Sequence, residues 1–283
     1  MSTTNKLSIY DLQLQAAQSR KQILRMCKAH SAGHLGGAFS CIDIVTALYF
    51  RVMKYDPQNP KWNERDRLIL SAGHKALAQY ASLCELGVFP DELLDTYGSL
   101  HCAMPGHPDM HKIPGIEGNT GALGHGLSLG CGMAIALRDQ GFKSKVYIIL
   151  GDGELAEGSN WEGAAIAAHY GLDNLVLVVD NNGLQIGGNV NEVMSFEPIT
   201  DRFAGFGWNS ELIDGHNMEE TVSALEGVLK NGKPTAIVAK TIKGKGYSRA
   251  EGDASYHFWA PSDAEMKEAE EENAEMIARL KNG

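Results

Sequence analysis

Three carboxylates follow an apolar run directly in the stretch GDGELAEG, residues 151–158. Asp152, Glu154 and Glu157 lie within six residues, and Gly151, Gly153 and Gly158 lie next to them. The preceding segment, VYIIL (146–150), is apolar throughout, which is typical of a strand buried on both faces of a sheet. A second apolar run, NLVLVVD (174–180), leads in the same way into Asn181 and Asn182. Oxygen-bearing side chains at two such strand ends are candidates for binding a metal ion.

Asp152 and Asn182 are the pair best suited to a metal. GDG or NNG alone is more often an ordinary turn. Two such segments, each after an apolar run and separated by a predicted helix, favour a site instead. The ends of neighbouring parallel strands share one edge of a sheet, so the two side chains can approach. Mg²⁺ prefers a few protein oxygens and completes its shell with phosphate and water. The adjacent glycines allow close approach of a bulky phosphate, and a helix from about residue 159 points its positive end there.

The elements that position this edge alternate between strand and helix, which predicts an α/β fold. We expect a mostly parallel sheet with helices on both faces, within a single domain spanning residues 1–283. A Gly- and Pro-rich loop over 98–126 contains several histidines and is expected to be functional. Strands are predicted over 67–73, 145–150, 174–180, 208–213 and 234–241, and helices over 7–28, 41–53, 74–87, 127–141, 159–170, 200–206, 217–230 and 262–281.

Composition excludes several classes of protein. Lys and Arg total 25 against 35 Asp and Glu, a net charge of −10, and no basic run is present, so we expect no nucleic-acid partner. The five cysteines are scattered without a C-x-x-C pair, which argues against disulfides and a zinc site. The N-terminus has no apolar region typical of a signal peptide, and we expect no membrane span. The expectation is a soluble, cytoplasmic protein.

GDG followed thirty residues later by NN resembles the thiamine diphosphate-binding motif. The resemblance implies that Asp152, Asn182 and the carbonyl of Leu184 hold Mg²⁺, or Ca²⁺ or Mn²⁺ in its place, on the cofactor diphosphate. It implies that Gly153 contacts the diphosphate and that Glu157 joins a charged network linking paired active sites. Glu154 has no role in that motif, and we predict that it is solvated.

The histidine motifs resemble those of transketolases, in the same order along most of the chain. They are AGHLGG (32–37), LSAGHKA (70–76), MPGHPD (104–109), EGNTGALGHG (117–126) and SYHFWAP (255–261). The resemblance implies that His34, His107 and His257 contact substrate hydroxyls and the carbonyl oxygen, and that His74 lies near the diphosphate and thiazolium. His257 is expected to reach the cofactor as well, and Gly121, Ala122 and Leu123 to contact it. The histidines outside these motifs are expected to be structural: His30, His101, His111, His169 and His216.

Four residues depart from the transketolase pattern. Leu35 replaces a proline, Ala72 an asparagine and His125 a glutamine. Phe258 replaces the glycine after His257, which is expected to reshape the pocket wall and to favour an unusual donor or acceptor.

The chain covers only the first domain of such an enzyme. The resemblance is therefore to the N-terminal subunit of a split transketolase, with sugar phosphate substrates. A separate C-terminal subunit would carry the pyrimidine-binding domain, and two copies of each would form an α2β2 assembly. The apolar segment 127–137 is expected to lie either in an interface or in the core. Alternatives are the α subunit of a 2-oxo acid dehydrogenase, a deoxyxylulose-phosphate synthase, a transketolase for a branched or sulfonated sugar, and a non-catalytic paralogue.

Overall fold

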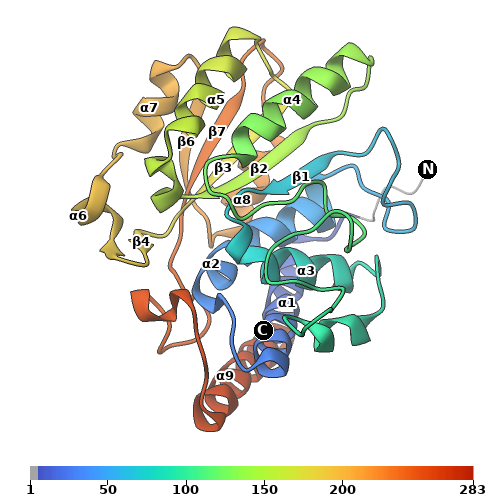
Figure 1. Ribbon diagram of the computed structural model, residues 1–283, viewed down its shortest axis with the longest axis vertical. Coiled ribbons are helices and arrows are strands. Elements are labelled where there is room, and N and C mark those ends of the chain that lie inside the picture. The colour runs from blue at the N-terminus through green and yellow to red at the C-terminus, as the bar shows by residue number, and fades with distance from the viewer. Residues whose placement is uncertain (1–5, 283) are drawn as a thin grey trace.

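A five-stranded parallel sheet forms the centre of the computed structural model, which describes residues 6–282 (Figure 1). Residues 1–5 and 283 of the predicted domain lie outside the described residues. The strands follow the order β1-β2-β3-β7-β6. Their bounds are Arg67–Leu70 for β1, Val146–Gly151 for β2, Leu175–Asn181 for β3, Asn209–Asp214 for β6 and Thr235–Lys240 for β7. A short antiparallel pair, β4 (Leu184–Gln185) and β5 (Gly188–Asn189), lies beyond the end of β3.

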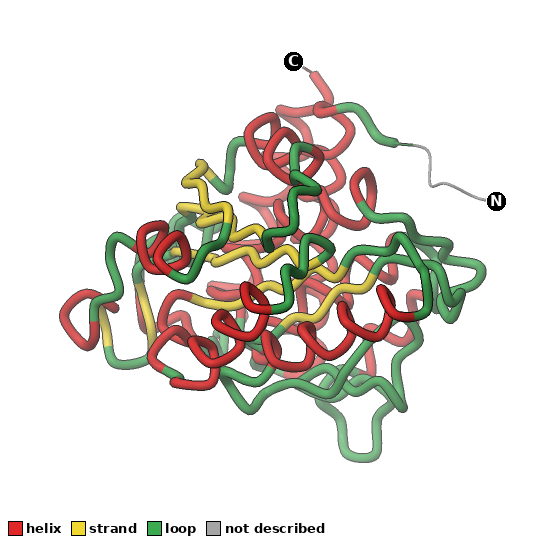
Figure 2. Tube along the Cα trace, turned by 90° about the horizontal axis from the view of Figure 1, so that it is seen from above, coloured by secondary structure: helices red, strands yellow, loops and turns green. Residues whose placement is uncertain are grey.

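Helices cover both faces of the sheet, as predicted. Helices α4, α5 and α7 pack on one face and α1, α2, α3 and α8 on the other, while α9 packs along α1 (Figure 1). Figure 2 shows the central strands crossing the middle of the molecule, with helices and loops around them. The helices are α1 (Ile9–His30), α2 (Leu35–Ala47), α3 (Ala76–Glu85), α4 (Gly126–Asp139), α5 (Gly158–His169), α6 (Val190–Met194), α7 (Ile199–Gly205), α8 (Met218–Glu226) and α9 (Asp263–Asn282).

The strand sequences divide the core into two layers because successive side chains point to opposite faces. In β2, Tyr147 and Ile149 join the cluster beneath α1 to α3, whereas Ile148 and Leu150 join the cluster beneath α4, α5 and α7. Both sets are fully buried, which explains why this strand is apolar at every position.

Three predicted boundaries are wrong by three residues or more: the helix predicted over 217–230 ends at Glu226, and the other two lie next to the glycine-rich motifs. The predicted helix over 41–53 begins at Leu35, and a π-helical turn continues it from Leu48 to Val52. Gly36 and Gly37 lie in its first turn. Glycine is needed at these positions because other parts of the chain pass close by: a Cβ on Gly36 would lie 2.7 Å from the Tyr256 carbonyl oxygen. The predicted strand over 67–73 ends at Leu70, and Gly73–Lys75 forms a 3₁₀ turn.

One described segment, Leu35–Val52, is long and apolar enough to cross a membrane by length and composition alone. It is 89% buried inside the molecule. Its apolar side chains therefore belong to the core.

Candidate functional site

The carboxyl ends of β2 and β3 are joined through Asp152. Gly151 pairs in register with Asp180, so the loops that follow the two strands leave the sheet side by side. One carboxylate oxygen of Asp152 accepts a hydrogen bond from the Gly183 N–H at 2.5 Å, and the other accepts one from Gly153 at 2.8 Å. The expected proximity of the GDG and NN segments is therefore present.

Asn182 is oriented by its neighbours. Its amide nitrogen donates to Asp180 at 3.2 Å, and its amide oxygen accepts from the Leu184 N–H at 3.1 Å. These contacts fix which atom of the amide is the oxygen, the atom that a metal ion would need.

A cavity of about 310 Å³ opens at this edge. It brings together residues of the GDG and NN segments with His74 and Leu123 from two other predicted motifs. Its lining includes Gly37, Ala72, His74, Lys75, Leu123, Gly151, Asp152, Gly153, Glu157, Asn182, Leu184, Ile186 and Lys243. Of the other predicted cofactor contacts, Ala122 is exposed, and Gly121 lies against His107 with a φ of 136° that favours glycine.

The four motif histidines form one cluster beside the cavity. The ring centre of His34 lies 5.4 Å from those of His74 and His257 and 6.1 Å from that of His107. The rings of His74 and His257 are 4.9 Å apart. Four separate segments therefore converge as expected, and Phe258 adds an aromatic ring 4.9 Å from His34.

Three of these histidines are neutral at physiological pH. Burial is the main cause that lowers the pKa of His34 and of His257 to about 4, and nearby positive or titratable groups lower it further. Burial and the adjacent Lys75 lower the pKa of His74 to about 2. A neutral imidazole both donates and accepts a hydrogen bond, which suits contact with sugar hydroxyls.

A buried ion pair that the sequence analysis did not identify lies beneath the cavity. The Lys75 ammonium is 2.5 Å from Asp180, and the two residues are 2% and 0% exposed. Ser40 and Thr241 also donate to Asp180. Burial alone would raise the pKa of Asp180, but Lys75 and these hydrogen bonds hold it below its usual range. The pair places a positive charge beside Gly151 and a fixed carboxylate beside Asn182.

Lys243 is the second lysine that the sequence analysis missed. It is 2% exposed, and its ammonium lies 3.3 Å from the Leu184 carbonyl oxygen and 3.0 Å from His257 Nδ1. Burial, with Lys75 nearby, lowers its pKa to about 8. Its position just after the predicted strand 234–241, at the same sheet edge, was the signal that could have identified it.

The prediction that Glu154 is solvated is wrong. Glu154 is 3% exposed and accepts hydrogen bonds from the Ser71 hydroxyl at 2.5 Å and from Gly124 and Gly151 N–H at 2.8 and 3.3 Å. The 3₁₀ turn over Asp152–Ala156 directs it inward, between the loops that follow β1 and β2. By contrast, Glu157 is exposed at the cavity rim, where its predicted role in a charged network stays a prediction.

The histidines expected to be structural lie outside the cluster. His30, His101, His111 and His169 are exposed, and His216 is hydrogen-bonded to Asp43 and to the Ile242 N–H. His125, which replaces the expected glutamine, is exposed and lies 3.1 Å from the Leu123 carbonyl oxygen.

The donor set fits a divalent cation that carries a diphosphate. Asp152, Asn182 and the Leu184 carbonyl offer three oxygens, and Lys75 and Lys243 supply positive charge on the cavity wall. Within residues 6–282, no group of three or more His, Cys, Asp or Glu side chains could hold a metal ion. A cation here would complete its shell with oxygens of the diphosphate and water, as Mg²⁺ does.

Comparison with known proteins identifies the family. Residues 14–274 match the model for "Transketolase, thiamine diphosphate binding domain". The chain is 41% identical to an apulose-4-phosphate transketolase subunit from Phocaeicola vulgatus, with 97% of this chain and 98% of that protein covered. It is 44% identical to the 6-deoxy-6-sulfo-D-fructose transketolase subunit SqwG of Clostridium sp. (strain MSTE9), with 91% and 96% covered.

Among solved structures, transketolase from Campylobacter jejuni superposes with a TM-score of 0.88 at 32% identity. The match covers 97% of this chain but 46% of that one, so the chain spans about half the length of that transketolase. Together with the family match, this shows that the chain belongs to the transketolase family and corresponds to its thiamine diphosphate-binding domain.

Proposed function

We propose that this chain is the N-terminal subunit of a transketolase. It transfers a two-carbon ketol unit from a ketose phosphate donor to an aldose phosphate acceptor, using Mg²⁺ and thiamine diphosphate. It is active only with a separate C-terminal subunit that carries the pyrimidine-binding domain, in a cytoplasmic α2β2 assembly. The observation that carries this proposal is the convergence of four histidines beside a cavity lined by Asp152 and Asn182.

The chain's contribution to the cofactor site is to hold the diphosphate end. When bound, thiamine diphosphate supplies the carbon nucleophile and the electron sink that ketol transfer needs. Asp152, Asn182 and the Leu184 carbonyl would hold the cation, and Gly153 would contact the diphosphate. The two lysines would offset part of the charge of the diphosphate, and His74 would lie near it.

The remaining histidines act on the sugar. Ketol transfer requires hydroxyl protons to move, and a positioned imidazole can accept or donate each one. His34 and His257 are neutral at physiological pH, so they are ready to accept a proton or to hydrogen-bond a carbonyl oxygen. His107, whose ring centre lies 6.1 Å from that of His34, would contact the substrate beside them.

Phe258 favours an unusual sugar as the substrate. It is 53% exposed at the edge of the histidine cluster, where the transketolase pattern has a glycine. The two relatives described above are named for apulose 4-phosphate and for a sulfonated fructose. Because those relatives are transketolases, they favour ketol transfer over 2-oxo acid oxidation.

The test is reconstitution. The purified chain is mixed with a co-expressed chain that carries a pyrimidine-binding domain, and two-carbon transfer is assayed over a panel of ketose donors that includes branched and sulfonated sugars. We expect activity only with both chains, Mg²⁺ and thiamine diphosphate, and loss of activity in Asp152→Ala. Glu162→Gln, an exposed change on α5, is the matched control. Robust transfer by the single chain, or no thiamine diphosphate dependence, would overturn the proposal.

A further inference from the structure

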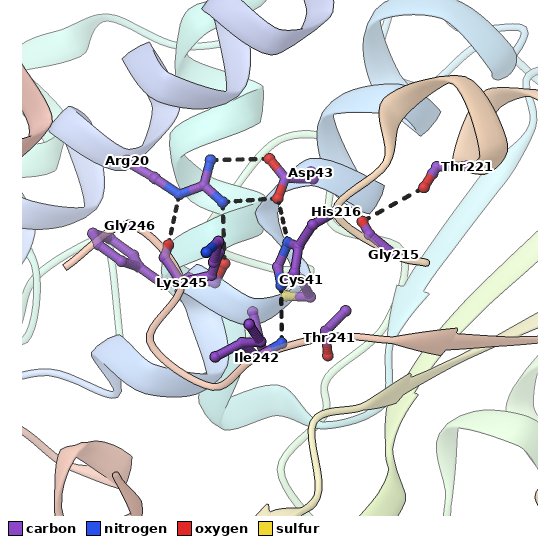
Figure 3. Close-up of polar contacts among 12 residues, drawn as sticks. Arg20, Cys41, Asp43, Gly215, His216, Thr221, Thr241, Ile242, Lys245 and Gly246 are labelled. Carbon is purple, nitrogen blue, oxygen red and sulfur yellow. Dashed lines mark hydrogen bonds and ion pairs between the residues drawn. The ribbon is translucent and has the colours of Figure 1, made fainter. Parts of the chain in front are cut away.

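A buried carboxylate outside the cavity, Asp43 on α2, joins two side chains from distant parts of the sequence. Arg20 of α1 donates to its two oxygens at 2.9 and 2.8 Å, and Nδ1 of His216, in the loop after β6, lies 2.8 Å from one of them (Figure 3). Asp43 is 8% exposed, and neither it nor its two partners lines the cavity.

Both partners of Asp43 also hold the loop that follows β7. Nε2 of His216 accepts a hydrogen bond from the Ile242 N–H at 2.9 Å, and Nε of Arg20 donates to the Lys245 carbonyl at 3.0 Å (Figure 3). A nitrogen that accepts from a backbone N–H carries no proton. In this arrangement the ring proton lies on Nδ1, from which His216 donates to Asp43.

Lys243 lies between the two held positions. Its backbone is confined further, because Gly244 N–H donates to Gly36 and Gly252 N–H donates to the Lys243 carbonyl, both at 2.9 Å. Its ammonium reaches the Leu184 carbonyl and His257. A long, flexible side chain such as lysine loses much rotamer freedom when fixed in one place, so a rigid backbone at its base is needed for a defined position.

We propose that Arg20, Asp43 and His216 are positioning residues that set the place of the Lys243 ammonium at the diphosphate-binding cavity. The inference rests on the proposed function, because it takes Lys243 to be a cation that contacts the cofactor diphosphate. The three residues touch neither cofactor nor substrate and act through residues 242–245. Asp43 orients both partners, and His216 transmits the constraint to the residue immediately before Lys243.

The two ring nitrogens of His216 can be tested separately. Asparagine places its amide nitrogen near the position of Nδ1, so His216→Asn keeps a donor to Asp43 and loses the acceptor for Ile242. Glutamine places its amide oxygen near the position of Nε2, so His216→Gln keeps that acceptor and loses the donor. Both variants remove one hydrogen bond of the same ring, which makes each the control for the stability loss of the other.

The experiment measures binding of thiamine diphosphate with Mg²⁺ to the full chain by calorimetry, alongside the denaturation midpoint of each variant. Lys243→Met measures the effect of losing the ammonium. We expect this variant to bind thiamine diphosphate roughly tenfold more weakly or worse. We expect His216→Asn to lose most of that affinity and His216→Gln to stay within about threefold of the wild type. In the Lys243→Met background, His216→Asn should cause no further loss, because the group that it positions is gone.

The outcomes separate the two proposals. If Lys243→Met binds as tightly as the wild type, the diphosphate role of Lys243 in the proposed function is wrong. If Lys243→Met is weakened but His216→Asn is not, or if His216→Asn and His216→Gln weaken binding equally, the positioning inference alone is wrong. If His216→Asn does not fold, Arg20→Lys replaces it, since it keeps a charge beside Asp43 and removes the Nε contact to Lys245. Unchanged affinity in Arg20→Lys overturns the inference.

Discussion

The carboxylate of Glu154 accepts hydrogen bonds from a hydroxyl and two backbone N–H groups that belong to three different loops at the sheet edge. All three partners are donors. A glutamine of the same shape would present an NH₂ group to at least one of them and leave buried groups unsatisfied.

We therefore expect Glu154→Gln to lower the free energy of unfolding by about 1–3 kcal/mol. Burial raises the pKa of Glu154, but its three donors favour the ionised form. Chemical denaturation of the isolated chain measures the effect. Glu162→Gln, exposed on α5, should change stability by no more than about 0.5 kcal/mol, and an equal loss in both variants would contradict the assignment.

The clustered histidines predict a pH dependence of stability. His34 and His257 have pKa values lowered to about 4, whereas an unfolded histidine titrates near 6.5. Between these values the unfolded state binds more protons, so their contribution is complete above pH 6.5 and is lost as the pH falls toward 4. The double variant His34→Gln/His257→Gln should show a shallower decline of the denaturation midpoint from pH 7 to 4.5. NMR titration should show neither ring becoming charged above about pH 5; titration near 6.5 would refute the prediction.

At the level of single residues, the sequence predicted the side chains that carry recognisable motifs and missed those that support them. Asp152 and Asn182 were predicted because each follows an apolar strand at the same sheet edge. Lys75 and Asp180 were missed because their pairing joins residues 105 positions apart. Nothing in the local pattern distinguishes a buried lysine from an exposed one, so Lys75 reads as an ordinary polar residue after His74.

At the level of elements, Asp180 at the end of β3 joins four segments. It accepts from Lys75 in the turn before α3, from Ser40 of α2 and from Thr241 after β7. Lys75→Met keeps the length of the side chain and leaves this carboxylate buried without its cation. We expect a loss of about 3–5 kcal/mol in the free energy of unfolding.

The double variant Lys75→Met/Asp180→Asn removes both charges and should recover part of that loss, which tests the pair itself. If the double variant is less stable than the single one, the ion pair does not account for the effect. Thermal or urea denaturation of the three proteins gives the comparison.

Helix α4 contains a matched pair of glycines. A Cβ on Gly130 would lie 2.1 Å from the Ile148 Cδ1 atom in the core, whereas a Cβ on Gly132 would meet nothing within 4 Å. Gly130→Ala should destabilise the chain by about 1–3 kcal/mol through overpacking. Gly132→Ala should stabilise it by roughly 0.5–1 kcal/mol, because alanine loses less entropy in a helix. Denaturation midpoints of opposite sign check the prediction; equal effects would contradict it.

The strand and helix periodicities predicted the α/β class because buried parallel strands read as continuous apolar runs, as in β2 and β3. The boundaries around Gly36 and Gly73 could not be predicted in this way. There the glycines are needed for close packing rather than for a positive φ: a Cβ on Gly73 would lie 2.7 Å from the backbone of Thr120 and Gly121, far along the chain. Such contacts form only in the assembled fold, so the local sequence does not predict them.

At the level of the whole molecule, α4 and α5 pack side by side (Figure 1), and each carries an exposed apolar side chain. Leu129 of α4 is 42% exposed and Ile166 of α5 is 43% exposed. The opposite face of α4, with Leu127 and Cys131, is buried in the core. The segment 127–137, expected to lie in an interface or in the core, thus has one face in the core and one face exposed to solvent. The exposed face is a candidate contact in the proposed α2β2 assembly.

We expect Ile166→Glu to weaken that assembly without unfolding the chain. A charge on an exposed position costs little in the single chain but is costly when an interface excludes water. Sedimentation velocity of the wild type and the variant, each with its partner subunit, measures the assembly, and circular dichroism checks the fold. Lys21→Glu, a charge change at an exposed position of α1, is the control. Unchanged assembly in Ile166→Glu would place the interface elsewhere.

The order of the strands also governs when the site can form during folding. Each pairing in the sheet is long-range: Arg67 pairs with Val146, and Val176 with Thr235. Parallel pairings between such distant segments close slowly. Because β3 lies between β2 and β7, one of its edges stays unpaired until residues 235–240 emerge from the ribosome. Thr241 and Lys243 follow immediately behind, so the cavity wall is completed only after residue 243 has emerged, and a pause before residue 235 would leave a central strand open to aggregation.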